Sequence, residues 1–113
     1  MFRVTLRVMA ATLAVLTVAG KASAFDGNKL SELCTLRSAD AQGICIGYAT
    51  AIGDAMSDRS SIVHGMKACI PNGATNSQLG AIMNQYIQQN PSVLHYEASY
   101  IVAAAYSKAF PCR

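Results

Sequence analysis

The sequence predicts an all-α protein, a compact bundle of about four helices braced by two disulfides. Apolar residues recur three and four positions apart along most of the chain, which is the spacing of one helix face. No stretch shows the apolar–polar alternation of a half-buried strand. The chain has four cysteines, an even number, and all of them follow a segment typical of export signals.

Residues 1–24 have the features of a cleavable signal peptide. Arg3 and Arg7 precede an apolar run over 8–18, and the segment ends in Ala-Ser-Ala, a typical cleavage pattern. The run is shorter than the roughly 20 residues of a membrane-spanning helix. We therefore expect one domain, residues 25–113, that is soluble in the periplasm with no membrane anchor. In such an oxidising compartment cysteines form disulfides.

The exported domain is expected to be nearly neutral. The formal net charge of the whole chain is +3, but Arg3, Arg7 and Lys21 lie in the predicted signal peptide. The remaining basic residues balance the six acidic ones. This balance argues against binding to nucleic acid or to an anionic membrane by bulk electrostatics.

Two helices are expected in the first half of the domain. The first covers residues 28–34, with Asp26 near its start, and the second covers 39–57 with Ser38 as its N-cap. The apolar residues of the second helix form a stripe spaced three and four apart: Ile44, Cys45, Tyr48, Ile52, Ala55 and Met56.

The second helix also carries a ridge of small residues, Gly43, Gly47 and Ala51. Each interior glycine costs a helix about 1 kcal/mol relative to alanine. A close contact would explain why this cost is tolerated. Packing within the chain is the favoured interpretation, and contact between two chains is the alternative.

Two more helices are expected after an irregular connector, residues 58–74. Thr75 with Gln78 is a capping box that opens the third helix. Its apolar face contains Leu79, Ile82, Met83, Tyr86 and Ile87. Pro91 ends this helix and lies in the first turn of the fourth, which stops at Pro111.

Four cysteines allow three pairings, and helix geometry favours one of them. If the third and fourth helices are antiparallel, Cys69 and Cys112 lie at the same end of the bundle. Cys34 and Cys45 face each other across a short bend. We therefore predict the pairs Cys34–Cys45 and Cys69–Cys112. A metal site is the weaker alternative, because zinc-binding cysteines usually occur in close pairs, so we expect no metal and no cofactor.

The sequence gives little indication of catalysis. None of the known serine or cysteine nucleophile signatures is present. His95, Tyr96 and Glu97 are expected on the surface of the fourth helix, where consecutive residues point in different directions. We predict no catalytic residues and no enzymatic activity. The tyrosines of the fourth helix are a weak indication of a protein interface.

Several segments, in order, resemble the Rap/Tai immunity proteins of type VI secretion systems. Phe25-Asp26-Gly27-Asn28-Lys29-Leu30 with Leu33-Cys34 is similar to the mature start of that family. The other similar segments are Cys45-x-Gly47-Tyr48, Gly53-Asp54, Cys69-Ile70-Pro71, Gln78, Tyr86, Pro91 and Phe110-Pro111-Cys112. The resemblance covers nearly all of residues 25–113, while 58–68 match no family pattern.

The resemblance implies a small, all-helical periplasmic protein without catalytic activity. Family members bind peptidoglycan amidases delivered by other cells and cover the active-site cleft, and several act as homodimers. The implied function is therefore immunity against a type VI secreted amidase effector. The alternative is a periplasmic stress or chaperone-like protein that exposes apolar surface in acid, for which six acidic residues give little leverage.

A polar run in the connector is the predicted partner-binding surface. Its residues follow no helical pattern and lie between two helices: Asp58, Arg59, Ser60, Ser61 and His64. A plain solvated connector is the equal alternative.

Overall fold

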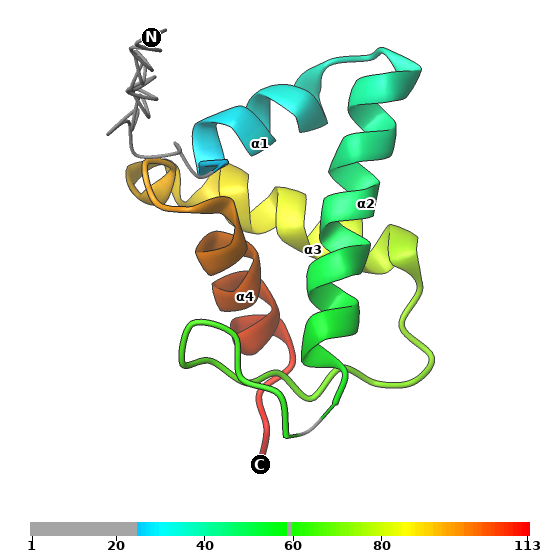
Figure 1. Ribbon diagram of the computed structural model, residues 1–113, viewed down its shortest axis with the longest axis vertical. Helices are drawn as coiled ribbons and strands as arrows, with labels where there is room; N and C mark the ends of the chain where they lie inside the picture. Colours follow the sequence, from blue (N-terminus) through cyan, green and yellow to red (C-terminus); the bar gives the residue numbers. More distant parts are fainter. Residues whose placement is uncertain (1–24, 59) are drawn as a thin grey trace, which may run out of the picture.

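The computed structural model describes residues 25–58 and 60–113 and confirms the predicted all-α fold. Within these residues there is no β-strand, and the helices are α1 (Gly27–Thr35), α2 (Ala39–Met56), α3 (Asn76–Gln89), the 3-10 helix η1 (Pro91–Val93) and α4 (Ala98–Ala109). Figure 1 shows α1 beside the first half of α2, with α3 and α4 packed along the rest of the bundle. The predicted signal peptide, 1–24, lies outside the described residues.

Side-chain caps begin the first three α-helices where the sequence predicts them. The Asp26 carboxylate accepts a hydrogen bond from the Lys29 N–H at 2.8 Å, and the Ser38 hydroxyl accepts one from the Ala41 N–H at 3.2 Å. Thr75 opens α3 with both bonds of a capping box. Each cap satisfies an amide that has no partner inside its helix.

The fourth helix begins at Ala98, so its predicted start at Pro91 was wrong. The carbonyl oxygens of Leu94 and Tyr96 accept hydrogen bonds from Asn28 and Gly27, the first residues of α1, each at 3.0 Å. These acceptors therefore face another segment and cannot continue a helix from Pro91. His95, Tyr96 and Glu97 consequently lie before α4 rather than on its first turns.

The core of the described residues contains one buried hydroxyl. Tyr106 is fully buried, and its hydroxyl donates to the carbonyl oxygen of Ala49 in α2 at 2.7 Å. Burial raises the pKa of Tyr106, so the phenol remains neutral. The largest other fully buried side chains are Leu30, Met56, Met83, Ile101 and Val102.

The buried face of α2 differs from the predicted stripe. Cys45 and Met56 are buried as expected, but Ile44 is 49% exposed and Ala55 is exposed. The buried face is rotated toward Ala49 and Gly53 because α3 packs closely there: a Cβ at Gly53 would lie 2.7 Å from Leu79 Cδ1. Small residues on this face of α2 allow α3 to pack closely against it.

The ridge of small residues on α2 does not pack against the described part of the chain. Gly43, Gly47 and Ala51 are exposed, and a Cβ added at either glycine would find no atom within 4 Å. Packing within the chain, the favoured interpretation of this ridge, was therefore wrong. The free energy that these glycines cost the helix is therefore not offset by packing against the described part of the chain.

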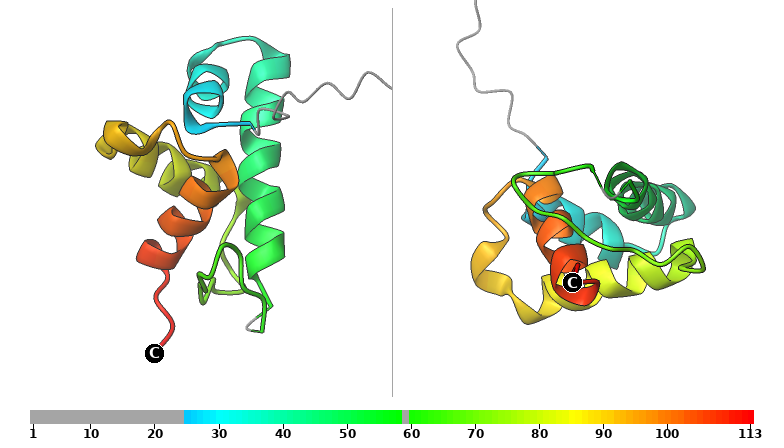
Figure 2. Two further views of the ribbon diagram at one scale, coloured as in Figure 1. Left: turned by 60° about the vertical axis from the view of Figure 1, so that its left-hand side comes forward. Right: turned by 90° about the horizontal axis from the view of Figure 1, so that it is seen from below.

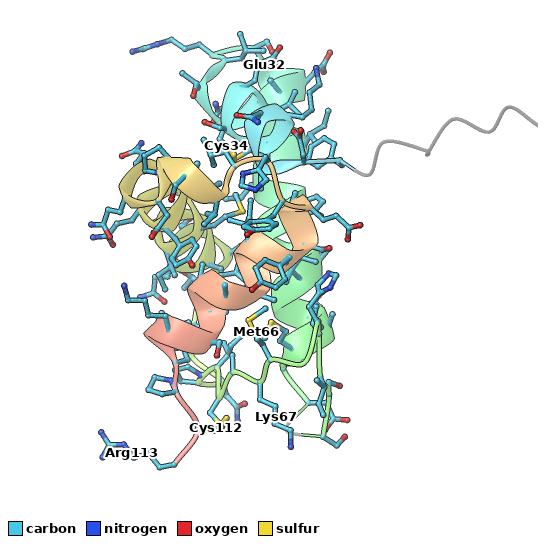
Figure 3. All side chains as sticks on the ribbon, turned by 90° about the vertical axis from the view of Figure 1, so that its left-hand side faces the viewer. Glu32, Cys34, Met66, Lys67, Cys112 and Arg113 are labelled. Carbon is cyan, nitrogen blue, oxygen red and sulfur yellow. A yellow bond between two sulfur atoms is a disulfide. The ribbon has the colours of Figure 1, made fainter. Side chains whose placement is uncertain are left out.

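Both predicted disulfides are confirmed. The sulfur atoms of Cys34 and Cys45 are 2.07 Å apart, and those of Cys69 and Cys112 are 2.03 Å apart. Figure 3 shows Cys34, in the last turn of α1, and Cys112, near the chain's C-terminus, at opposite ends of the molecule. Among the described helices, none is long and apolar enough to cross a membrane.

Candidate partner-binding surface

The connector between α2 and α3 contains a regular turn that the sequence pattern did not indicate. Val63 and Met66 exchange both backbone hydrogen bonds, at 3.0 and 2.9 Å. The two residues between them, His64 and Gly65, have φ angles of 49° and 78°. Positive φ at both central residues defines a type I′ turn. The connector thus has a defined tip, which Figure 2 shows close to α4.

His64 fixes this tip to the start of α4. Its Nε2 atom lies 2.7 Å from the Ser99 hydroxyl oxygen and 4.0 Å from a carboxylate oxygen of Glu97. Its ring also meets the edge of the Tyr100 ring, with centroids 5.8 Å apart. Behind the tip, Met66 is half-buried and packs against the core. The turn and α4 therefore form one continuous surface.

The histidine–serine contact does not form a catalytic relay. In a Ser-His-acid triad the carboxylate binds the ring nitrogen opposite the one that faces serine. Here both Ser99 and Glu97 face Nε2 of His64. Ser99 also hydrogen-bonds Tyr48, which partly offsets the rise that burial causes in the pKa of Tyr48. Ser99 is thus a junction between α2, α4 and the turn.

A second tight turn precedes the first. The Asp58 carboxylate accepts hydrogen bonds from the Ser60 N–H and hydroxyl, at 2.9 and 2.8 Å, and the Asp58 carbonyl accepts one from the Ser61 N–H. These bonds hold the pKa of Asp58 below its usual value, so its charge persists in mild acid. Asp58 is a fixed negative charge on an exposed turn.

The structure places the predicted contact residues on two consecutive turns. Asp58, Ser60 and His64 are exposed and Ser61 is half-buried, while Arg59 lies outside the described residues. Their role in binding remains a prediction.

Three large exposed side chains lie at or near these turns, and sequence reasoning missed the first of them, while the two tyrosines were among those named as a weak indication of an interface. Ile62, between the turns, is 58% exposed, and Tyr96 and Tyr100 are 47% and 41% exposed. Tyr96 stacks at a tilt against Tyr100, with ring centroids 5.5 Å apart, and against His95 at 4.3 Å. We call His95, Tyr96, Tyr100 and His64 the aromatic row. The spacing of Tyr96 and Tyr100, four residues apart, could have indicated that these two rings are neighbours, but nothing in the sequence places His64 beside them.

An apolar groove beside the start of α3 offers no acid–base chemistry. Its volume is about 490 Å³, and its lining contains no titratable side chain: Pro71, Gly73, Ala74, Gln78, Ala81, Ile82 and Phe110. Among the described residues no three His, Cys, Asp or Glu side chains gather as a metal site would require. The arrangement can bind a partner through exposed turns and aromatic side chains.

These features define a small, disulfide-linked helical binding protein. Residues 26–112 match the family of Rap1a immunity proteins, and the chain belongs to that family. Membership indicates an immunity protein that binds a secreted effector, and proteins of this class are generally not enzymes. The search of the curated proteins and the search of the solved structures found no similar chain.

Proposed function

We propose that this protein is a periplasmic immunity protein that binds and inhibits a type VI secreted peptidoglycan amidase, protecting the cell that produces it. The observation that carries the proposal is the family match over residues 26–112. The two disulfides fit an oxidising compartment. The export signal predicted in residues 1–24 would deliver the chain there.

The proposed mode of inhibition is occlusion by a pre-formed surface. The turns at Asp58 and His64 are fixed by their own hydrogen bonds and by the contact with Ser99. A surface that is ordered before binding loses less conformational entropy on association. We propose that Asp58, Arg59, Ser60, Ser61 and His64 contribute to this contact.

A homodimer is a further proposal about assembly. Gly43, Gly47 and Ala51 leave the outer face of α2 free of bulky side chains, and Ile44 lies exposed on the same helix. A second copy could approach closely at such a face. Sedimentation equilibrium of the mature chain would measure its mass directly.

The proposed function is tested by co-expression with candidate type VI secreted amidases from the same genome, beginning with any that is encoded beside this gene. We expect the two proteins to co-purify and the amidase to lose peptidoglycan hydrolysis when this protein is added. Cells that export the amidase should lyse unless this protein is also exported. The control is the same chain without residues 1–24, which should not rescue. Lysis despite equal periplasmic amounts of both proteins would refute the proposal.

The alternative, a stress or chaperone-like protein, predicts a different result. Such a protein should prevent aggregation of unrelated unfolded clients at low pH. An inhibitor has no such requirement, and we expect light scattering of acid-treated client proteins to be unchanged by its addition. Client protection together with no amidase binding would favour the alternative.

A further inference from the structure

Four aromatic rings from two separate segments form one exposed row. From His95 the row passes through Tyr96 and Tyr100 to His64, with centroid distances of 4.3, 5.5 and 5.8 Å. All four residues are classed as exposed. Neighbouring exposed aromatic side chains with polar tips are typical of protein interfaces rather than of a folding core. The row joins the predicted contact turn to α4.

The surface beside this row is negatively charged. The Glu97 side chain is 57% exposed, and among the described ion pairs its contact is His64 at 4.0 Å. The backbones of Glu97 and Asp26 lie opposite each other in an isolated antiparallel bridge. The hydrogen bonds of this bridge are made by the residues on either side of them. Two acidic residues therefore lie opposite each other here, and a partner cation would be attracted to their combined charge.

We propose that the aromatic row and Glu97 receive a cationic side chain, an arginine or a lysine, from the effector protein. This inference rests on the proposed function and names the contact through which the effector would dock. The face of a tyrosine ring attracts cations, and a carboxylate beside it adds a charge-assisted hydrogen bond. Arginine fits such a site well because its planar group can stack and bind a carboxylate together.

The geometry of the rings argues against a flat ligand such as a sugar. The planes of Tyr96 and Tyr100 are tilted by 46°, and those of His64 and Tyr100 by 68°. A sugar or nucleobase stacked across the row would need several coplanar ring faces. A compact cation needs only one ring face, which the row provides, and one carboxylate, which Glu97 provides.

His64 is a positioning residue in this arrangement. Its bond to Ser99 holds the turn against α4, and the exposed Ile62 lies two residues before His64 in the chain. Ile62 is well exposed and has no packing role that explains its place. It would contact apolar atoms of the effector around the bound cation.

The test compares two carboxylates with nearly equal exposure. Glu97→Gln removes the charge beside the row, and Glu32→Gln removes one on α1, where the side chain is 58% exposed and pairs with Lys29. Figure 3 shows Glu32 at the outer end of α1. Affinity for the amidase identified by the co-expression test of the proposed function is measured by calorimetry at two salt concentrations. We expect Glu97→Gln to weaken binding by about 10-fold and Glu32→Gln by less than about 2-fold.

Two further measurements identify the cation. Tyr100→Leu keeps the apolar bulk but removes the aromatic face, and should weaken binding by about 10-fold. Arginine and lysine residues of the amidase are then changed singly to alanine. We expect one of these alanine changes to weaken binding much less in the Glu97→Gln protein than in the unmodified protein. Such non-additivity is the signature of a direct pair. Unfolding temperatures of the variants should not fall.

The outcomes separate this inference from the proposed function. If the unmodified protein binds the amidase and Glu97→Gln and Tyr100→Leu bind equally well, the inference is overturned and the function stands. If all amidase cations couple to Glu97 no more than to Glu32, the inference is likewise overturned. If the unmodified protein does not bind the amidase, both fall together.

Discussion

The two ends of α2 are stabilised in different ways. At its N-terminal end α1 packs directly against it, and Cys34–Cys45 joins residues only 11 apart in sequence. At its C-terminal end the chain leaves the helix, and the described residues between 57 and 75 form no further helix. There Cys69–Cys112 joins residues 43 apart and attaches this connector to the chain beyond α4. Figure 1 shows the contrast between the two ends.

This difference separates a scaffold from a candidate contact surface. The α1 end is held by helix caps and by the packing of α1 against α2. The disulfide there links two helices that already pack against each other. The connector end has two small turns, the anchor at His64 and one long-range covalent link. Binding residues are often found in such connecting segments, held by a rigid scaffold. The shape of the connector therefore depends on a few interactions that can be removed one at a time.

Removing each disulfide gives the largest expected effect. Cys69→Ala with Cys112→Ala should lower the free energy of unfolding by about 4 kcal/mol, and Cys34→Ala with Cys45→Ala by about 3 kcal/mol. The reason is that closing a longer loop removes more entropy from the unfolded chain. Urea unfolding without reductant measures both.

Hydrogen exchange adds a local measurement to this comparison. The amides of Val63 and Met66 should exchange faster in the variant without the Cys69–Cys112 disulfide. Their exchange rates should not change in the variant without Cys34–Cys45. Equal exchange in the two variants would show that the connector does not depend on its nearer disulfide.

Gly27→Ala tests the α1 end and should cost about 3 kcal/mol. A Cβ at Gly27 would lie 2.9 Å from backbone atoms of Leu94 and would also overlap the side chain of Ile101. The backbone of Leu94 cannot move away easily, since its carbonyl binds the Asn28 amide. Thermal unfolding would detect the change. A loss below about 0.5 kcal/mol would show that the two segments separate at little cost.

Local signals predicted much of this fold correctly. The caps at Asp26, Ser38 and Thr75 depend on residues within one turn, so sequence alone locates them. The disulfide pairing followed from the antiparallel course of two helices. Each of these features is decided by neighbours in sequence or by one simple rule of topology.

Features decided by distant segments were predicted less well. The start of α4 depends on the first residues of α1, whose amides bind the carbonyls of Leu94 and Tyr96. The buried face of α2 depends on where α3 approaches Gly53. Both contacts join segments that are far apart in sequence. The aromatic row was missed for the same reason, since His64 and Tyr100 are far apart in sequence and only the fold of the connector brings their rings together.

Changes at His64 test the anchor of the connector and should have moderate effects. His64→Asn keeps a residue that tolerates positive φ and removes the ring, so we expect a loss of about 1 kcal/mol. His64→Ala also strains the turn and should cost about 2 kcal/mol. Ser99→Ala, which removes the anchor from the other side, should match His64→Asn. Urea unfolding measures all three. A Ser99→Ala variant as stable as the original would mean that the histidine–serine contact contributes nothing to stability.

The smallest effects are expected on the outer face of α2, and they have the opposite sign. Gly43→Ala and Gly47→Ala should each stabilise the protein by about 0.5 to 1 kcal/mol, because alanine favours the helix and no atom lies near the new Cβ. Gly53→Ala is the control, since its Cβ would meet Leu79, and it should not stabilise. Thermal unfolding of the monomer gives these values. If the two exposed substitutions stabilise the monomer yet weaken self-association or amidase binding, then the glycines are kept for a contact between chains. If they change neither, the outer face of α2 has no partner, and the interface must lie at the connector end of the helix.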